Sequence, residues 1–302
     1  MTRTTASSIA AMALLSSASF AQVSASKQVP AGPGGQIDFL DTKAGENFTR
    51  NIVLTGYWPP TNNQVRRFSP KPSSNPDGWI GQDWEGRGWN IISFFPEFPG
   101  QTGPSWGQGS GDFEVDYQDT SADWERLVEN YKPAAIVTFS RAGNDLDWEL
   151  EGGNRMYSPS QWTSDYAGER KPGADLPIMQ ALSPGTELFS SLPIDDIMAG
   201  VDRDVPELNT FSPTIDNGRF LSNYIGLHGN WYHSMNNAPD AEYRNFAAGH
   251  IHVGYGMSDT QAELATLSTL RTLTDTLNGV IPAPGTAAVL SLGLLAGARR
   301  RR

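Results

Sequence analysis

The chain has 302 residues, no cysteine, and 22 Lys and Arg against 33 Asp and Glu, which gives a formal net charge of −11. The absence of cysteine excludes a disulfide framework and a thiol nucleophile. The acidic balance disfavours nucleic acid and anionic membranes as partners, and about 260 residues between the apolar ends suffice for one large core or two smaller ones.

The N-terminus has the pattern of a secretory signal peptide. Arg3 precedes an apolar stretch over residues 9–15, and small residues then lead to Ala21. We therefore predict a signal peptide over residues 1–21, with cleavage before Gln22. Residues 22–49 are rich in Gly, Ala and Ser and are expected to form an N-terminal extension to a domain over residues 50–280.

Four short apolar segments predict buried strands, and loops follow three of them. The strands are expected at 50–56, 90–95, 134–139 and 249–253, and the loops at 57–63, 140–151 and 254–258. Apolar residues at helical spacing predict helices over 121–130, from about 216 onward, and from a capping box at 258–261 to 278–279. The buried stripe expected on the last helix comprises Leu264, Leu267, Leu270, Leu273 and Leu277.

Strands that alternate with helices predict an α/β fold, with three layers and a mostly parallel central sheet that has helices on both faces. Residues 151–184 are polar and are expected to form an irregular surface. The active cleft of such a sheet lies at the carboxyl ends of its strands. The three loops are therefore expected to converge at that cleft.

One predicted helix start carries a candidate nucleophile. Asp216 or Asn217 is expected to cap the helix, and Phe220, Tyr224, Leu227 and Trp231 follow at helical spacing. Ser222 lies off this buried stripe and near the first turn, where free N–H groups and the helix dipole favour developing negative charge.

A later strand carries two histidines on one face, His250 and His252, because side chains alternate along a strand. A hydroxyl at a helix start and a histidine on a strand are the parts of a nucleophile–base pair. The alternative is a capping serine with two core or surface histidines. The histidine pair is also compatible with a metal, but the spacing fixes no third ligand, so we predict neither a metal nor another cofactor.

The C-terminus has three parts that are typical of a sorting signal. A segment with Pro282 and Pro284 precedes an apolar run over 287–298, and four arginines end the chain. Twelve residues span about 18 Å as a helix, which is short of the ~30 Å hydrocarbon core. Residues 281–302 resemble the PEP-CTERM signal of bacterial exopolysaccharide-associated proteins, with Pro-Ala-Pro in place of Pro-Glu-Pro. The resemblance implies an exported protein at the cell surface or outside the cell, processed by exosortase-type machinery after transient inner-membrane contact.

Four motifs in order resemble the pyroglutamyl peptidase I family, peptidase family C15. Residues 52–57 match its opening strand and Thr-Gly-Phe turn, and residues 132–143 match its Lys-Pro…Gly-Gln-Ala-Gly segment. Residues 218–223 match its Gly-Arg-Tyr-Leu-Cys-Asn helix start, and residues 251–253 match its Ile-His-Val strand. The resemblance covers residues 51–277 and implies the pyroglutamyl-peptidase, or phosphorylase/hydrolase-like, fold.

The family is a Cys-His-Glu hydrolase that removes N-terminal pyroglutamate, and its catalytic positions fall on named residues of this chain. Ser222 stands at the cysteine position and His252 at the histidine position. Glu151 stands at the glutamate position, or Glu149 if the loop is shorter by two residues. The resemblance also places substrate contacts in two loops, at Tyr57, Trp58, Ala142, Gly143 and Asn144.

The chain departs from the family pattern at the nucleophile and in both loops. Serine replaces cysteine, Asn144 and Asp145 replace a glycine and an arginine, and Pro59 and Pro60 occupy a loop that has Gly-Gly in the family. An alcohol needs a base to take its proton, whereas a thiolate forms readily. Two functions follow: a serine hydrolase of a peptide or small amide, or a catalytically inactive relative with a binding or matrix-associated role.

Overall fold

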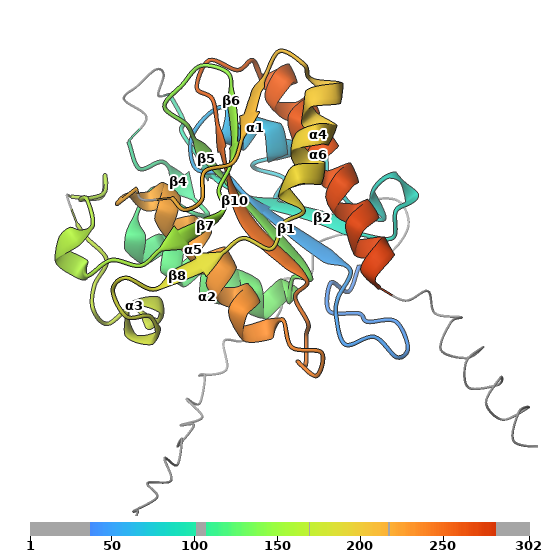
Figure 1. Ribbon diagram of the computed structural model, residues 1–302, viewed down its shortest axis with the longest axis horizontal. Coiled ribbons are helices and arrows are strands. Elements are labelled where there is room, and N and C mark those ends of the chain that lie inside the picture. Colours follow the sequence, from blue (N-terminus) through green and yellow to red (C-terminus); the bar gives the residue numbers. More distant parts are fainter. Residues whose placement is uncertain (1–36, 101–106, 169, 217, 282–302) are drawn as a thin grey trace, which may run out of the picture.

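A six-stranded sheet forms the centre of the part of the chain that the computed structural model describes, residues 37–100, 107–168, 170–216 and 218–281 (Figure 1). Its strand order is β2-β1-β5-β10-β6-β9. The strands are β1 (Asn51–Thr55), β2 (Asn90–Phe94), β5 (Ala135–Arg141), β6 (Asp147–Leu150), β9 (Asn209–Phe211) and β10 (Ala247–Val253). Two small sheets pair β3 (Pro96–Glu97) with β4 (Ser110–Gly111), and β7 (Gly153–Arg155) with β8 (Glu187–Phe189).

The four predicted strands form the parallel part of this sheet, so the predicted fold class is confirmed. β2, β1, β5 and β10 are parallel neighbours. All five residues of β1 are buried, as expected for a strand that is covered on both faces. The last two strands reverse direction, because β6 pairs antiparallel with β10 and β9 runs parallel to β6.

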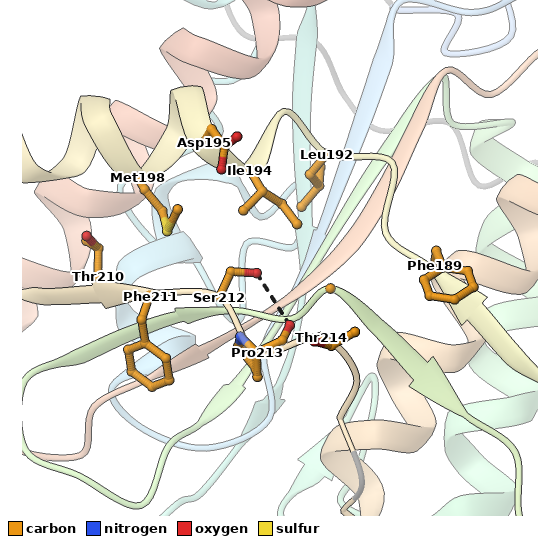
Figure 2. Close-up of a pocket in the computed structure, with 11 residues that line it drawn as sticks. Phe189, Leu192, Ile194, Asp195, Met198, Thr210, Phe211, Ser212, Pro213 and Thr214 are labelled. Atoms are coloured by element: carbon orange, nitrogen blue, oxygen red, sulfur yellow. Dashed lines mark hydrogen bonds between the residues drawn. The ribbon is translucent and has the colours of Figure 1, made fainter.

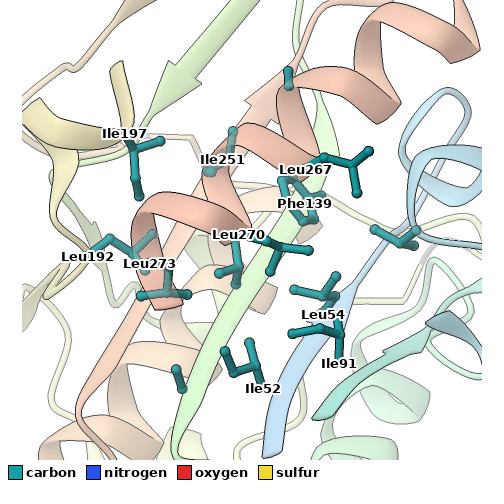
Figure 3. Close-up of a cluster of buried hydrophobic side chains, with 14 of the residues drawn as sticks. Ile52, Leu54, Ile91, Phe139, Leu192, Ile197, Ile251, Leu267, Leu270 and Leu273 are labelled. Carbon is teal, nitrogen blue, oxygen red and sulfur yellow. The ribbon is translucent and has the colours of Figure 1, made fainter. Parts of the chain in front are cut away.

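Helices α1 (Thr61–Val65), α4 (Ile194–Asp204) and α6 (Asp259–Val280) cover one face of the sheet. Figure 3 shows Leu267, Leu270 and Leu273 of α6 directed at side chains of β1, β5 and β10. The predicted capping box of α6 is present, since Ser258 Oγ accepts from the Gln261 N–H at 3.2 Å. The helix continues to Val280, slightly beyond its predicted end.

The predicted stripe of α6 is wrong at Leu264, which is 43% exposed. Steps of three residues fall about 60° short of a full turn in a helix with 3.6 residues per turn, so a repeat of three drifts off the buried face. Ala262 and Ala265 cover the sheet at that end of the helix instead, and both are fully buried.

Helices α2 (Tyr117–Tyr131) and α5 (Leu221–Asn236) cover the opposite face, and the short helix α3 (Pro177–Ala181) lies outside them (Figure 1). The helix expected over 121–130 begins at Tyr117, because Asp116 accepts from the N–H groups of Gln118 and Asp119.

The helix expected to begin at 216–218 begins at Leu221. Phe220 is its N-cap residue and provides no side-chain cap. Asp216 Oδ1 accepts instead from the Gly218 N–H at 2.6 Å. Its side chain therefore closes a local turn before the helix, and the prediction of Asp216 as the cap is corrected, while the alternative cap, Asn217, lies outside the described residues.

The segment over 151–184, expected to be an irregular surface, adds to the core. Met156 and Ile178 are fully buried, and Trp162 is 1% exposed. Its polar composition conceals these anchors, because they do not recur at a helix or strand period.

Several sequence predictions fall outside the described residues. These are the signal peptide over 1–21 and, apart from Ile281, the sorting segment over 281–302. The described part of the N-terminal extension packs against the domain, where Phe48 is 5% exposed and Thr49 is fully buried. None of the helices in the described ranges combines the length and the apolar character needed to span a membrane.

Candidate functional site

Three ionisable side chains share one face of the β6–β10 pair. His252 lies directly opposite Glu149 in the antiparallel ladder, and the Glu151 N–H donates to the His250 carbonyl at 2.9 Å. Side chains directly opposite one another in such a ladder lie on the same face, and so do residues two apart. The ladder therefore brings Glu149, Glu151 and His252 together.

The histidine and the carboxylate at the family's glutamate position are hydrogen-bonded. His252 Nδ1 lies 2.8 Å from Glu151 Oε1 and 3.6 Å from Glu149 Oε2. The Glu151 side chain is 2% exposed, the His252 side chain 12% and the Glu149 side chain 23%. Of the two predicted glutamates, Glu151 thus makes the hydrogen bond, and Glu149 lies beside it nearer to solvent.

This cluster shifts the proton affinities of its own members. Burial favours the neutral form of His252, but the Glu151 hydrogen bond and the charges of Asp216, Glu151 and Glu149 outweigh burial and raise its pKa. Burial raises the pKa of Glu151 to about 7, although the His252 hydrogen bond opposes that rise. Burial also raises the pKa of Glu149. The Glu151 carboxyl therefore exchanges its proton close to neutral pH, while the pKa values of His252 and Glu149 both lie above their usual values.

His250 occupies a different environment two residues away. Its Nδ1 is hydrogen-bonded to Thr138 Oγ1 at 2.7 Å and its Nε2 to Ser140 Oγ at 2.8 Å. The residue is fully buried, and burial holds its pKa well below the usual value. Both ring nitrogens are occupied by hydroxyl groups, so His250 is a neutral core residue.

Ser222 is the second residue of α5 and is partly buried. No acceptor in the described ranges receives the N–H groups of Leu221, Ser222 and Asn223, as expected for the first turn of a helix. Among the described residues, no hydrogen bond joins Ser222 Oγ to His252. The structure therefore joins His252 to Glu151 and leaves the predicted nucleophile unbonded to its base.

The start of α5 is tied to the chain just beyond Glu151. Asn223 Nδ2 donates to the carbonyls of Arg155 and Gly218, both at 2.8 Å, and Asn223 Oδ1 accepts from the Arg155 N–H. The Asp216 N–H donates to the Gly153 carbonyl at 2.8 Å. These bonds fix the helix start relative to β7, which follows β6 directly.

The loops after β1, β5 and β10 converge, as the parallel sheet predicts. The Ala142 N–H donates to the Val253 carbonyl and the Tyr255 N–H to the Asn144 carbonyl, at 2.7 and 3.1 Å. The Arg141 guanidinium lies 5.5 Å from the Trp58 ring and 5.7 Å from the Tyr255 ring. One cation thus bridges aromatic side chains from two of the loops.

The predicted substrate-contact residues occupy different depths in these loops. Gly143 and Asn144 are exposed, Trp58 is half-buried and Ala142 is 6% exposed. Tyr57 is 3% exposed, and its hydroxyl is hydrogen-bonded to Thr120 in the core. The structure therefore gives Tyr57 a packing role and leaves its side chain almost no surface for a ligand.

A separate groove of about 740 Å³ lies at the edge of the sheet (Figure 2). Ile194 and Met198 of α4 form one side, residues 210–214 form the other, and Gly152 and Phe189 also line it. Neither Ser222 nor His252 lines this groove. Nothing in the sequence indicated it, because its lining comes from segments without a regular pattern.

Sequence reasoning missed β6 and the grouping of Glu149 and Glu151 with Asp216. The signal was present as strict alternation, with Trp148 and Leu150 apolar and Glu149 and Glu151 polar, which is typical of a strand. A run of only four alternating residues is short and adjoins a loop, so the sequence alone predicts these residues as part of the loop over 140–151.

Comparison with known proteins supports the fold. A variant pyrrolidone carboxyl peptidase from the hyperthermophile Pyrococcus furiosus is 16% identical, with a TM-score of 0.52 over 76% of this chain and 100% of its own. The pyrrolidone carboxyl peptidase from Thermococcus litoralis is 15% identical, with a TM-score of 0.52 over 78% of this chain and 99% of its own. No protein-family model and no curated protein sequence matches the chain.

These solved structures share the pyroglutamyl-peptidase fold with this chain across nearly their whole length. At such low identity the likeness concerns the fold and the order of its elements. The motifs in residues 52–57, 132–143, 218–223 and 251–253 lie on β1, on β5 and its flanks, at the start of α5 and on β10. The arrangement therefore places the candidate residues on a hydrolase-like fold.

Proposed function

We propose that the protein is an exported hydrolase that cleaves a peptide or small amide bond, with Ser222 as nucleophile, His252 as base and Glu151 as the residue that orients the base. One observation carries the proposal: His252 Nδ1 lies 2.8 Å from the buried Glu151 Oε1. A carboxylate on Nδ1 holds the proton there and leaves Nε2 free to accept another.

The chemistry follows from that tautomer. His252 Nε2 takes the Ser222 proton as Oγ attacks the carbonyl carbon, and the imidazolium then returns this proton to the leaving amine. A water molecule hydrolyses the acyl-enzyme by the same route. The charges of Glu151, Glu149 and Asp216 favour the imidazolium, in line with the raised pKa of His252.

The oxyanion of this reaction has donors close to the nucleophile. The N–H groups of Leu221, Ser222 and Asn223 have no acceptor in the described ranges, and the helix dipole adds partial positive charge at the same end. Preorganised donors of this kind stabilise a developing oxyanion without reorganisation. In this proposal Trp58, Ala142, Gly143 and Asn144 contact the substrate.

A second candidate function, a catalytically silent binding or matrix-associated protein, rests on a specific observation. Ser222 Oγ is not hydrogen-bonded to His252 in the described part of the chain. An alcohol does not ionise on its own near neutral pH, so a serine that never meets its base stays unreactive. The two candidate functions therefore differ in one property, namely whether Ser222 reacts as a nucleophile.

Labelling with a fluorophosphonate probe separates these candidates. We expect one probe per chain, and we expect the label to disappear in Ser222→Ala and to fall strongly in His252→Ala. Ser234→Ala is a matched control, because Ser234 is an exposed serine on the same helix. Absence of label from a folded wild-type chain would show that the hydrolase proposal is wrong and would leave the silent relative.

Export and sorting belong to the same proposal. The signal-peptide pattern over 1–21 and the PEP-CTERM-like segment over 281–302 indicate secretion, exosortase-type processing and a final position at the cell surface or outside the cell. The last helix ends at Val280, directly before this segment. Intact-mass measurement on protein from the native host is expected to lack Arg299–Arg302. A mass that includes these arginines would contradict the sorting proposal.

A further inference from the structure

The carboxylates and the imidazole of the β6–β10 pair are spaced like ligands of one metal ion. One donor atom each from Glu149, Glu151 and His252 lies within 4.8 Å of the other two. His252 Nδ1 is 2.8 Å from Glu151 Oε1 and 3.6 Å from Glu149 Oε2. Ligand atoms at about 2.1 Å from a tetrahedral ion are about 3.4 Å apart, and the two measured distances bracket this value.

Within the described ranges, two buried carboxylate oxygens near this cluster lack a hydrogen-bond partner. Glu151 Oε2 is one, on a residue that is 2% exposed, and Asp216 Oδ2 is the other, on a residue that is 8% exposed. Asp216 lies close enough for its charge to act on His252 and both glutamates. An unpartnered buried carboxylate oxygen is costly, and a bound cation offsets that cost.

We propose that Glu149, Glu151 and His252 form a binding site for one divalent transition-metal ion of the zinc class. Imidazole nitrogen with carboxylate oxygen suits zinc and its neighbours, whereas magnesium and calcium prefer oxygen ligands alone. Three protein ligands leave a fourth position for water, and the cluster is open to solvent at Glu149 and His252, with 23% and 12% of their side chains exposed. Asp216 adds negative charge beside the ligands.

The site has a consequence for the hydrolase and, in this respect, rests on the proposed function. An ion on His252 Nδ1 displaces the proton to Nε2, which then donates and no longer accepts. The same ion takes Glu151 away from its orienting role. His252 therefore cannot remove the Ser222 proton while the ion is bound, and the ion inhibits the hydrolase reversibly.

Binding of Zn²⁺ alone tests the site without any activity. The full chain, purified without a histidine tag, competes for zinc with a chromogenic chelator at pH 7.5, and we expect one ion per chain. Glu149→Gln should weaken binding at least tenfold, and His252→Gln should abolish it. Glu242→Gln and His233→Gln are controls outside the cluster and should bind like the wild type.

The variant Glu149→Gln avoids a misleading loss of fold. Its side chain makes no hydrogen bond within the described ranges, where its approach to His252 is 3.6 Å, and glutamine preserves its volume. Zinc affinity that is the same in Glu149→Gln, His252→Gln and the controls would overturn the proposal. Ser222→Ala should bind zinc normally, because the serine is not a ligand.

The inhibitory effect is read from probe labelling. Zinc should suppress labelling of Ser222 in the wild type, a chelator should restore it, and Glu149→Gln should need at least tenfold more zinc for the same suppression. Zinc binding without any labelling of Ser222 would contradict the hydrolase proposal and support the metal site. Labelling that saturating zinc leaves unchanged would overturn the inhibitory role.

Discussion

The side chains that the parallel strands direct at α6 and the side chain buried at the end of β6 differ in kind. Strands β1, β5 and β10 meet α6 through aliphatic and aromatic groups, as at Ile52, Phe139 and Ile251. One strand further, Glu151 is buried directly after β6, and among the described residues one of its carboxylate oxygens has no hydrogen-bond partner. A fully satisfied apolar interior stabilises a fold, whereas an unsatisfied charge is tolerated where it serves a site.

His250 and His252 show the same contrast within one strand. Both lie on one face of β10, and their ring centroids are 4.7 Å apart. Burial lowers the pKa of His250, whose ring is hydrogen-bonded to two hydroxyl groups, while carboxylate partners outweigh burial and raise the pKa of His252. Position on the strand sets the direction of each side chain, and the side chains supplied by the neighbouring strand set the proton affinity of the histidine.

The largest effect is expected in the apolar region. Leu270→Ala should lower the free energy of unfolding by about 2–5 kcal/mol, because Leu270 is fully buried against the sheet. Leu264→Ala is the matched control on the same helix. It should change the free energy of unfolding by no more than about 0.5 kcal/mol, since Leu264 is 43% exposed. Urea titration measures both. Equal losses would place the core elsewhere.

The next effect concerns acid sensitivity, which we assign to His228 of α5, on the face that α2 and α5 cover. Burial lowers the pKa of His228 to about 3, against a usual value of 6.5. The unfolded chain therefore binds a proton below pH 6.5 that the folded chain refuses. The free energy of unfolding should fall by about 1.4 kcal/mol per pH unit through this group as pH drops from 6.5 towards 3.

The variant His228→Gln isolates that contribution. Glutamine does not titrate and retains an N–H that reaches towards Ser121, the present partner of His228 Nε2 at 3.1 Å. Urea titrations at pH 7, 6, 5 and 4 should therefore show the variant losing stability more slowly than the wild type. Parallel curves would mean that His228 is protonated in the folded state.

The sequence predicted the parallel strands because each is a short apolar run bounded by glycine or proline, and such runs need no knowledge of their partners. It also predicted that Glu151 and His252 belong to one site, but only through the resemblance to a family. The hydrogen bond between them depends on the register of β6 against β10. That register joins residues about 100 positions apart, so no local pattern encodes it.

Asp216 shows why the sequence did not predict the start of α5 or the position of Asp216 beside the cluster of Glu149, Glu151 and His252. Asparagine and aspartate before a helix are usual caps, and the sequence offers no sign that the chain turns once more before Leu221. The turn is set by contacts with β7, including the bond from the Asp216 N–H to the Gly153 carbonyl. Tertiary contacts therefore moved the helix start by three residues and left Asp216 beside the cluster.

The smallest expected effect is a change of about one unit in the pKa of a thiol at position 222. It tests whether this position faces His252, whether or not the natural protein is an active enzyme. Ser222→Cys introduces the only cysteine of the chain, at the first turn of α5 and on the sheet face that carries His252. Free N–H groups and an imidazolium both favour a thiolate. The pKa of this thiol should therefore fall below the ~8.5 of a free thiol.

The pH dependence of iodoacetamide labelling measures that pKa, with a chelator present to keep metal ions away from His252. Ser234→Cys, on the exposed side of the same helix, should keep an ordinary value near ~8.5. The thiol pKa of the double variant Ser222→Cys, His252→Ala should move back towards that value, because the imidazolium no longer stabilises the thiolate. A Ser222→Cys thiol with the same pKa as the Ser234→Cys thiol would show that residue 222 does not face the histidine, and the antiparallel edge would then hold charge without reactivity.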